Sequence, residues 1–165
     1  MFFTKSEKIK RKLRYLYLAS HHILILILLS KRVAIVPILG KTLSTLIDSF
    51  IRFAYGTDLT STSLDIKNLV VGHPVGVVLG GNGIKSDGLL HVSSGVVFAQ
   101  KYKNARYRQP FFEFHGDVII GANTVLVGPL KIIGPTYIGA LSLVDKDIIE
   151  PGTYIGSPVK KVNEK

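Results

Sequence analysis

A six-residue period in the C-terminal half of the chain constrains the fold more than any other feature. Cut from Val118, the sequence reads VIIGAN, TVLVGP, LKIIGP, TYIGAL and SLVDKD. The third position of each unit is aliphatic: Ile120, Leu126, Ile132, Ile138 and Val144. Glycines fall at or next to the ends of the units. An aliphatic residue at every sixth position, without helical spacing between, indicates a repeat architecture.

A unit of this length has room for one short strand and one tight turn. Three units make a three-sided coil of about 18 residues, and coils stack at the strand spacing of roughly 4.8 Å. Aliphatic side chains fill the inside, while glycine and proline suit the corners. We therefore predict a mainly β fold, a parallel β-helix.

The same alternation of short apolar runs and glycine turns begins before the regular units. The pieces from Val71 are VGHPVG, VVLGGN, GIKSDG and LLHVSS, and FEFHGD directly precedes Val118. The phase breaks between Gly95 and Phe112, which predicts a loop that leaves the β-helix at about residues 100–111. Its content is polar and basic, and a loop of this length in a repeat array is usually functional.

Residues 1–58 read differently and are expected to form an N-terminal helical region, with the β-helix domain at 59–165. Apolar residues at spacings of three and four, such as Leu43, Leu46 and Phe50, predict a helix from about Lys41 to Tyr55. An apolar stretch at 15–30 predicts an earlier helix, and Pro37 and Gly40 separate the two.

The formal net charge of +10 is concentrated at the front of the chain. Six basic residues lie close together: Lys5, Lys8, Lys10, Arg11, Lys12 and Arg14. The uncharged run that follows, at 15–30, is shorter than the roughly 18 to 20 residues of a spanning helix, and it lacks a signal-peptide cleavage pattern. Two readings remain open: a helix that packs on the protein or a sister subunit, or an interfacial segment on anionic lipid. No base-reading motif accompanies the charge, so nucleic acid is not expected as a partner.

Three motifs carry a resemblance to a known family. They are His73-Pro-Val-Gly-Val-Val-Leu-Gly80, the units from Gly121-Ala-Asn to Asp147, and Tyr154-Ile-Gly-Ser-Pro-Val-Lys-Lys161. From about Leu59 to Val162 the chain resembles the serine acetyltransferase-like branch of the hexapeptide acyltransferases. It looks closest to members that O-acetylate bacterial surface polysaccharides or their precursors. Ser157 stands where the family's closing Gly-Asn-Pro-Ala-Lys motif has asparagine.

The resemblance implies a left-handed β-helix, a homotrimer with active sites between subunits, acetyl-CoA as co-substrate and no metal. It also implies that His73 is the general base. An alcohol is a poor nucleophile at neutral pH, and a histidine can take its proton and pass it to the departing thiolate. The alternative is an ordinary corner histidine, hydrogen-bonded to backbone.

His91 follows His73 by three units of the repeat, which is one full coil. A constant period would stack the two histidines about 5 Å apart at the backbone. His91 would then bind and orient the acceptor or tune His73 by charge repulsion; otherwise it is a partly exposed surface residue. His115 is expected to be structural. The three histidines are widely spaced, a loop intervenes and the chain has no cysteine, so they do not predict a metal site.

Two departures from the serine-specific enzymes bear on the acceptor. Gly72 stands where those enzymes have an acidic residue, and Pro110-Phe111 stand where they have an Arg-His pair. A free amino acid needs fixed charges for its ammonium and carboxylate. We therefore expect a sugar hydroxyl of a surface polysaccharide or its precursor as acceptor, with Arg106 and Arg108 meeting an anionic group. Serine O-acetylation in cysteine biosynthesis and a non-catalytic β-helix scaffold are the alternatives.

For the donor, the resemblance implies small residues at coil edges that admit the pantetheine arm and terminal lysines that meet its phosphates. The matching positions are Gly121, Ala122, Gly139, Ala140, Pro158, Lys160 and Lys161. Turn geometry for the glycines and a solvated tail for the lysines are the competing explanations. A cytoplasmic location is expected, and peripheral contact with the inner membrane face through the N-terminal segment remains open.

Overall fold

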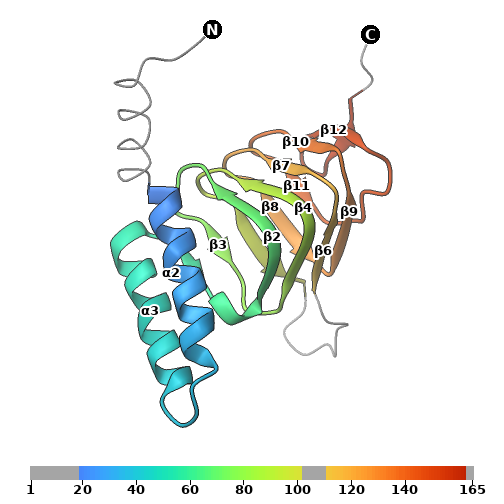
Figure 1. The fold of residues 1–165 in the computed structure, drawn as a ribbon. Coiled ribbons are helices and arrows are strands. Elements are labelled where there is room, and N and C mark those ends of the chain that lie inside the picture. The colour runs from blue at the N-terminus through green and yellow to red at the C-terminus, as the bar shows by residue number, and fades with distance from the viewer. Residues whose placement is uncertain (1–18, 102–110, 163–165) are drawn as a thin grey trace, which may run out of the picture.

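Two helices and a stack of short strands make up the structure (Figure 1). The computed structural model describes residues 19–101 and 111–162. The helices are α2 (Ala19–Ala34) and α3 (Gly40–Tyr55), and a 3-10 turn, η1 (Ser61–Ser63), follows. The strands are β1 (Asp58–Leu59), β2 (Leu64–Val71), β3 (Val78–Leu79), β4 (Ile84–Val92), β5 (Val97–Gln100), β6 (Phe112–His115), β7 (Val118–Ile120), β8 (Val125–Gly128), β9 (Leu130–Ile133), β10 (Thr136–Ile138), β11 (Leu143–Val144), β12 (Gly152–Ile155) and β13 (Lys160–Lys161).

The strands stack because the chain winds repeatedly around one core. β8, β9 and β10 pair in parallel with β5, β6 and β7, respectively, so that one circuit of the chain adds a strand to each of three sides. Earlier circuits pair β1 with β3 and β2 with β4, and the last pairs β11 with β8 and β12 with β10. β13 is antiparallel to β12. The architecture is therefore mainly β, as the six-residue period predicts.

A circuit of three repeat units holds only from β6, β7 and β8 to β9, β10 and β11, and the last circuit, from β10 to β12, is shorter. Phe112 pairs with Leu130, and Val118 pairs with Thr136, so that both pairs are separated by three units of the repeat. Ile84, in contrast, pairs with Phe112, a separation clearly longer than three units. The extra length falls where the sequence predicts a loop at about 100–111, and residues 102–110 of that loop lie outside the described part of the chain.

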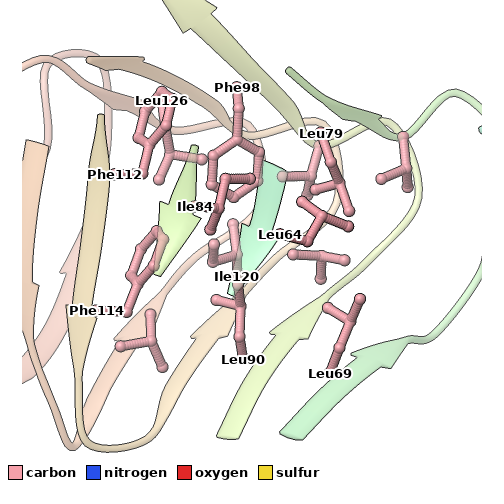
Figure 2. Packing of buried hydrophobic residues seen from close by; sticks show 14 of the residues in the cluster. Leu64, Leu69, Leu79, Ile84, Leu90, Phe98, Phe112, Phe114, Ile120 and Leu126 are labelled. Carbon is pink, nitrogen blue, oxygen red and sulfur yellow. The ribbon is translucent and has the colours of Figure 1, made fainter. Parts of the chain in front are cut away.

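The core lies inside the circuits and is built from the aliphatic third positions. All five of these residues have no exposed side-chain surface, which confirms that part of the sequence prediction. Aromatic rings fill the wider part of the core, where Phe98 packs edge-on against Phe112 with centroids 4.9 Å apart (Figure 2). Phe111, at the end of the predicted loop, is only 2% exposed and packs on Phe112 at 5.2 Å. The chain has thus returned to the core by residue 111.

A buried polar network fastens the helical hairpin to the first circuit. The carboxylate of Asp48 on α3 accepts hydrogen bonds from the Ser30 hydroxyl at 2.9 Å and from the Ser61 amide at 3.0 Å. The Ser61 hydroxyl also donates to Asp48 at 2.5 Å. All three residues are buried, so each bond satisfies a group that would otherwise be costly to remove from water. α3 then ends at Gly56, whose left-handed φ of 64° lets its amide reach the Arg52 carbonyl.

α3 differs from an ordinary amphipathic helix in the face that it buries. Ser44 and Asp48 face the protein and are buried, whereas Leu46 and Phe50 are 60% and 54% exposed. The polar side of α3 faces inward because the partners of Asp48 lie there. Burying a carboxylate without partners would cost more free energy than is lost by leaving a leucine exposed. The apolar stripe of the second helix therefore faces outward. Neither of the two described helices is long and apolar enough to cross a bilayer.

Candidate active site

One corner of the stack brings His73 together with two residues predicted to bind the donor. In the register of β2, β4, β7, β10 and β12, Val71 is level with Val92, then Ile120, then Ile138. Two positions after these come, circuit by circuit, His73, Ser94, Ala122 and Ala140. We call this row the histidine corner. Backbone hydrogen bonds such as Gly121 N–H to the Ile138 carbonyl at 2.8 Å hold its levels together.

His73 is exposed at the first level of this corner, on backbone that is well braced. The carbonyl of the next residue, Pro74, accepts hydrogen bonds from the Thr57 hydroxyl at 2.7 Å and from the Val77 amide at 3.2 Å. Among the residues that the structure describes, none forms a hydrogen bond with the His73 imidazole. The described residues thus show no backbone hydrogen bond to the His73 ring, which is exposed, and its role as general base stays a prediction.

The predicted stacking of His91 on His73 is wrong in register. Val70, not His73, is level with His91. The ladder between β2 and β4 starts with Leu64 level with Ile84, and its offset increases by one where an irregularity interrupts it between Ile66 and Asn68. The ladder ends with Val71 level with Val92, and beyond it the Gly95 amide donates to the Val75 carbonyl at 3.1 Å, so His73 lies in a turn that is longer than the turn of the next circuit. The extra residue of the irregularity lies at Asp87-Gly88 in β4, and a glycine inside a strand is a usual sign of a bulge, which a count in sixes passes over.

His91 nevertheless lies beside the catalytic candidate, through Gly72. A Cβ atom on Gly72 would lie 2.9 Å from Nε2 of His91, so the imidazole occupies the space that a side chain at position 72 would need. His91 is half-buried there. The glycine before His73 is thus explained by packing against a ring from the next circuit.

The four predicted donor residues at this corner separate into two kinds. Gly121 and Gly139 are buried, and a Cβ on Gly121 would lie 2.5 Å from the Ala140 amide nitrogen. Close stacking of the circuits accounts for Gly121, whereas a Cβ on Gly139 would meet the side chain of Ile155, at 2.6 Å. Ala122 is half-buried and Ala140 is exposed, so these are the positions where a ligand could approach the corner. Ala140 lies three levels from His73, about 14 Å along the stack.

The remaining predicted site residues lie at the far end or outside the described residues. Pro158 and Lys160 are exposed next to the last circuit, about 19 Å from the level of His73. Lys161 forms an ion pair with Glu150 at 3.2 Å, so its charge is already partly used within the protein. Arg106 and Arg108 fall in 102–110, outside the described residues, and their predicted acceptor role stays a prediction.

His115 belongs to a different corner and has structural partners. Its Nδ1 lies 2.8 Å from the Asp87 carboxylate, which also accepts the Gly116 amide at 2.7 Å. The amide first, and the imidazole second, hold the pKa of Asp87 below its ordinary 3.8, because both favour the ionised carboxylate. In the described ranges, 19–101 and 111–162, no three histidine or acidic side chains gather closely enough to hold a metal.

The lowered pKa of Asp87 makes a testable contribution to stability. Because the folded-state pKa is depressed, the stabilisation is complete above pH 3.8 and is lost as the pH falls through the lower, folded-state value. We expect Asp87→Asn to unfold at a lower urea concentration than the wild type at neutral pH, and the difference to shrink in acid. Urea midpoints measured across this range check the prediction, with Asp65→Asn as a surface control. A difference that stays constant with pH would contradict it.

Comparisons with known proteins agree with this geometry at the level of the fold. No protein-family model matches the sequence. A protein of Schizosaccharomyces pombe named "Putative serine acetyltransferase" is 28% identical over 122 residues, which cover 74% of this chain and 44% of that protein. The serine acetyltransferase of Neisseria gonorrhoeae superposes with a TM-score of 0.76 at 24% identity, over 92% of this chain and 57% of that one.

Two further structures contain ligands. The gonococcal enzyme in complex with serine gives a TM-score of 0.72 at 24% identity, over 92% of this chain and 60% of that chain. The serine acetyltransferase of Brucella abortus in complex with coenzyme A gives 0.72 at 20% identity, over 90% of this chain and 57% of that chain. The chain thus spans roughly half the length of the proteins that it matches. It has the serine acetyltransferase-like, hexapeptide-repeat transferase fold.

Proposed function

We propose that this chain is an acetyl-CoA-dependent serine O-acetyltransferase with His73 as its general base, on a left-handed parallel β-helix. One observation carries the proposal. The exposed imidazole of His73, which no described residue engages, shares one corner with Ala122 and Ala140, the small residues open to a ligand. The serine acetyltransferase fold supports the reaction class, and the coenzyme A complex of the Brucella relative supports the donor.

The sequence-based expectation of a sugar acceptor is wrong. The similar proteins are serine acetyltransferases, and the gonococcal enzyme binds serine. The expectation relied on two departures, and each of them has a packing counterpart. Nε2 of His91 lies in the space beside Gly72, and Phe111 is a core residue only 2% exposed. Both departures are therefore compatible with serine as the acceptor.

The proposed reaction needs one proton acceptor and one rigid frame. His73 takes the proton of the serine hydroxyl while the hydroxyl oxygen attacks the thioester carbonyl of acetyl-CoA. An O–C bond forms and the C–S bond breaks. The imidazolium then returns its proton to the departing thiolate, which leaves as coenzyme A. The braced corner holds the ring in place, which lowers the entropic part of the barrier.

The donor is proposed to lie along the histidine corner. Ala122 and Ala140 let the pantetheine arm come close to the backbone, and Lys160, exposed at the far end, is placed to meet a phosphate. Lys161 contributes less, because Glu150 already pairs with it. A homotrimer with sites between subunits remains part of the proposal, as the family resemblance implies.

Coenzyme A release from acetyl-CoA, followed with a thiol reagent, tests the function. We expect release to depend on added L-serine, and O-acetylserine to accumulate in equal amount by mass spectrometry. D-serine and L-alanine are the matched controls, because one inverts the geometry of serine and the other lacks its hydroxyl. Folded protein that releases no thiol with serine would refute the proposal and favour a non-catalytic scaffold.

A further inference from the structure

The outer face of the helical hairpin is apolar, and none of the residues that the structure describes covers it. A groove of about 290 Å³ runs between the helices and is lined entirely by apolar residues: Leu26, Val33, Leu43, Leu46, Ile47 and Phe50. Phe53, one turn beyond Phe50, is 91% exposed. A contiguous apolar surface of this kind usually marks a contact with another molecule.

The loop that joins α2 and α3 continues this surface to the end of the hairpin. Ile35 is 82% exposed and Ile38 is 97% exposed, with Val36 and Leu39 exposed beside them. Ile38 also has a left-handed φ of 70°, which is costly for a β-branched residue. In Figure 1 the loop lies at the lower end of the hairpin and projects past the strands. An apolar tip that projects from the body could enter another phase without moving the rest of the protein.

The charged residues that flank this loop along the chain have one sign. Arg32 and Lys41 are exposed on the two sides of the loop. The sequence has no acidic residue from Lys8 to Ile47. Asp48, the first acidic residue after that range, is buried and directed at Ser30 and Ser61, so it does not offset the cations at the surface.

We propose that the hairpin docks on an anionic lipid surface, with its loop inserted among the headgroups and Arg32 and Lys41 against lipid phosphates. Apolar side chains that sink into the interface, flanked by basic residues that stay at the headgroups, are the chemistry of a peripheral membrane contact. This inference does not rest on the proposed acetyl transfer. It extends the sequence's interfacial reading of the apolar stretch, but assigns the contact to the loop and the outer face of α3.

The charges favour lipid over a second copy of the chain. A symmetric dimer that joined the two loops would place Arg32 and Lys41 of both copies near one another, and the sequence from Lys8 to Ile47 supplies no acidic residue to compensate. An anionic membrane supplies the missing negative charge. The inner face of α2 is already occupied, because Ile23 and Ile27 belong to the protein core.

A tryptophan reporter tests the docking directly, because the chain contains no tryptophan. We expect full-length Ile38→Trp to show a blue-shifted emission when vesicles of phosphatidylcholine and phosphatidylglycerol are added, and no shift with phosphatidylcholine alone. Ile149→Trp, at an exposed apolar position on the last circuit, is the matched control and should not respond. Emission from Ile38→Trp that shifts with protein concentration and without lipid would instead identify a second copy and overturn the proposal.

Vesicle flotation with hairpin variants provides the second arm. Arg32→Ala/Lys41→Ala should weaken binding to the anionic vesicles about 30-fold. Each basic residue near an anionic surface contributes to the binding free energy, and this variant removes two of them. Ile35→Ser/Ile38→Ser should weaken it at least about tenfold. Lys131→Ala/Lys146→Ala, which removes two exposed cations elsewhere, is the control. Binding that survives both hairpin variants would place the anchor elsewhere, and absence of binding by the wild type would equally refute the proposal.

Discussion

Replacement of His73 by alanine should lower kcat for serine-dependent coenzyme A release by about 10² to 10⁴-fold, the usual contribution of a positioned general base. The expected loss is specific to chemistry. His73 is exposed and no described residue forms a hydrogen bond with its ring, so its removal leaves no buried group without a partner. The thermal midpoint should therefore change little. Steady-state kinetics with saturating serine, together with circular dichroism, measure the two effects separately.

Two other histidines supply the controls. His115→Gln removes a partner of Asp87 at a different corner, so it should affect stability and leave kcat nearly unchanged. His91→Asn empties the space beside Gly72 and should alter the KM for serine more than kcat, if His91 orients the acceptor as predicted. A His73→Ala protein that retains wild-type kcat would exclude His73 as the base. Equal losses from all three substitutions would indicate a general structural effect instead.

The fold was predictable because its cause is periodic. The aliphatic third positions, Ile120 and Ile138 among them, are fully buried, and the circuits that join β6, β7 and β8 to β9, β10 and β11 have the length that three units require. The register of the early circuits was not predictable. The ladder between β2 and β4 already starts with a separation longer than three repeat units and slips by one more residue at an irregularity, so that His91 is level with Val70 and not with His73. A period extrapolated across such a shift assigns the wrong neighbour to every residue beyond it.

The helices show a second limit of pattern reading. Spacing identified the helix near 41–55, but the apolar stripe faces outward, because Asp48 and Ser44 turn inward to a polar network. Hydrophobic periodicity reports that a helix has two faces, and the partners of its polar residues decide which face is buried. Those partners, Ser30 and Ser61, come from separate elements. The candidate site shares this property: the corner position of His73 follows its motif, whereas the approach of His91 to Gly72 depends on the fold.

Gly121→Ala should lower the free energy of unfolding by about 3 kcal/mol, at the upper end of the usual cost of overpacking. The added Cβ would lie 2.5 Å from the Ala140 nitrogen, 2.8 Å from the Gly139 carbonyl carbon and 2.9 Å from the Ile138 oxygen. These are backbone atoms, so no side chain can rotate away to make room. For a chain of this size the loss corresponds to a fall in Tm of about 6 to 12 °C.

Substitutions at Gly121 and Ala140 can distinguish a packing role of the histidine corner from a donor-binding role. Gly81→Ala is the matched control for stability, because its Cβ would meet nothing closer than the Thr60 hydroxyl at 3.4 Å. Ala140→Tyr places bulk on the exposed side of the corner, so we expect a higher KM for acetyl-CoA with an unchanged Tm. If Gly121→Ala instead kept its Tm and raised only that KM, Gly121 would be a donor contact and not a requirement of the stacking. The close backbone approach at Gly121 argues for the first outcome, because an atom that does not fit between two circuits disturbs them whether or not a ligand is bound.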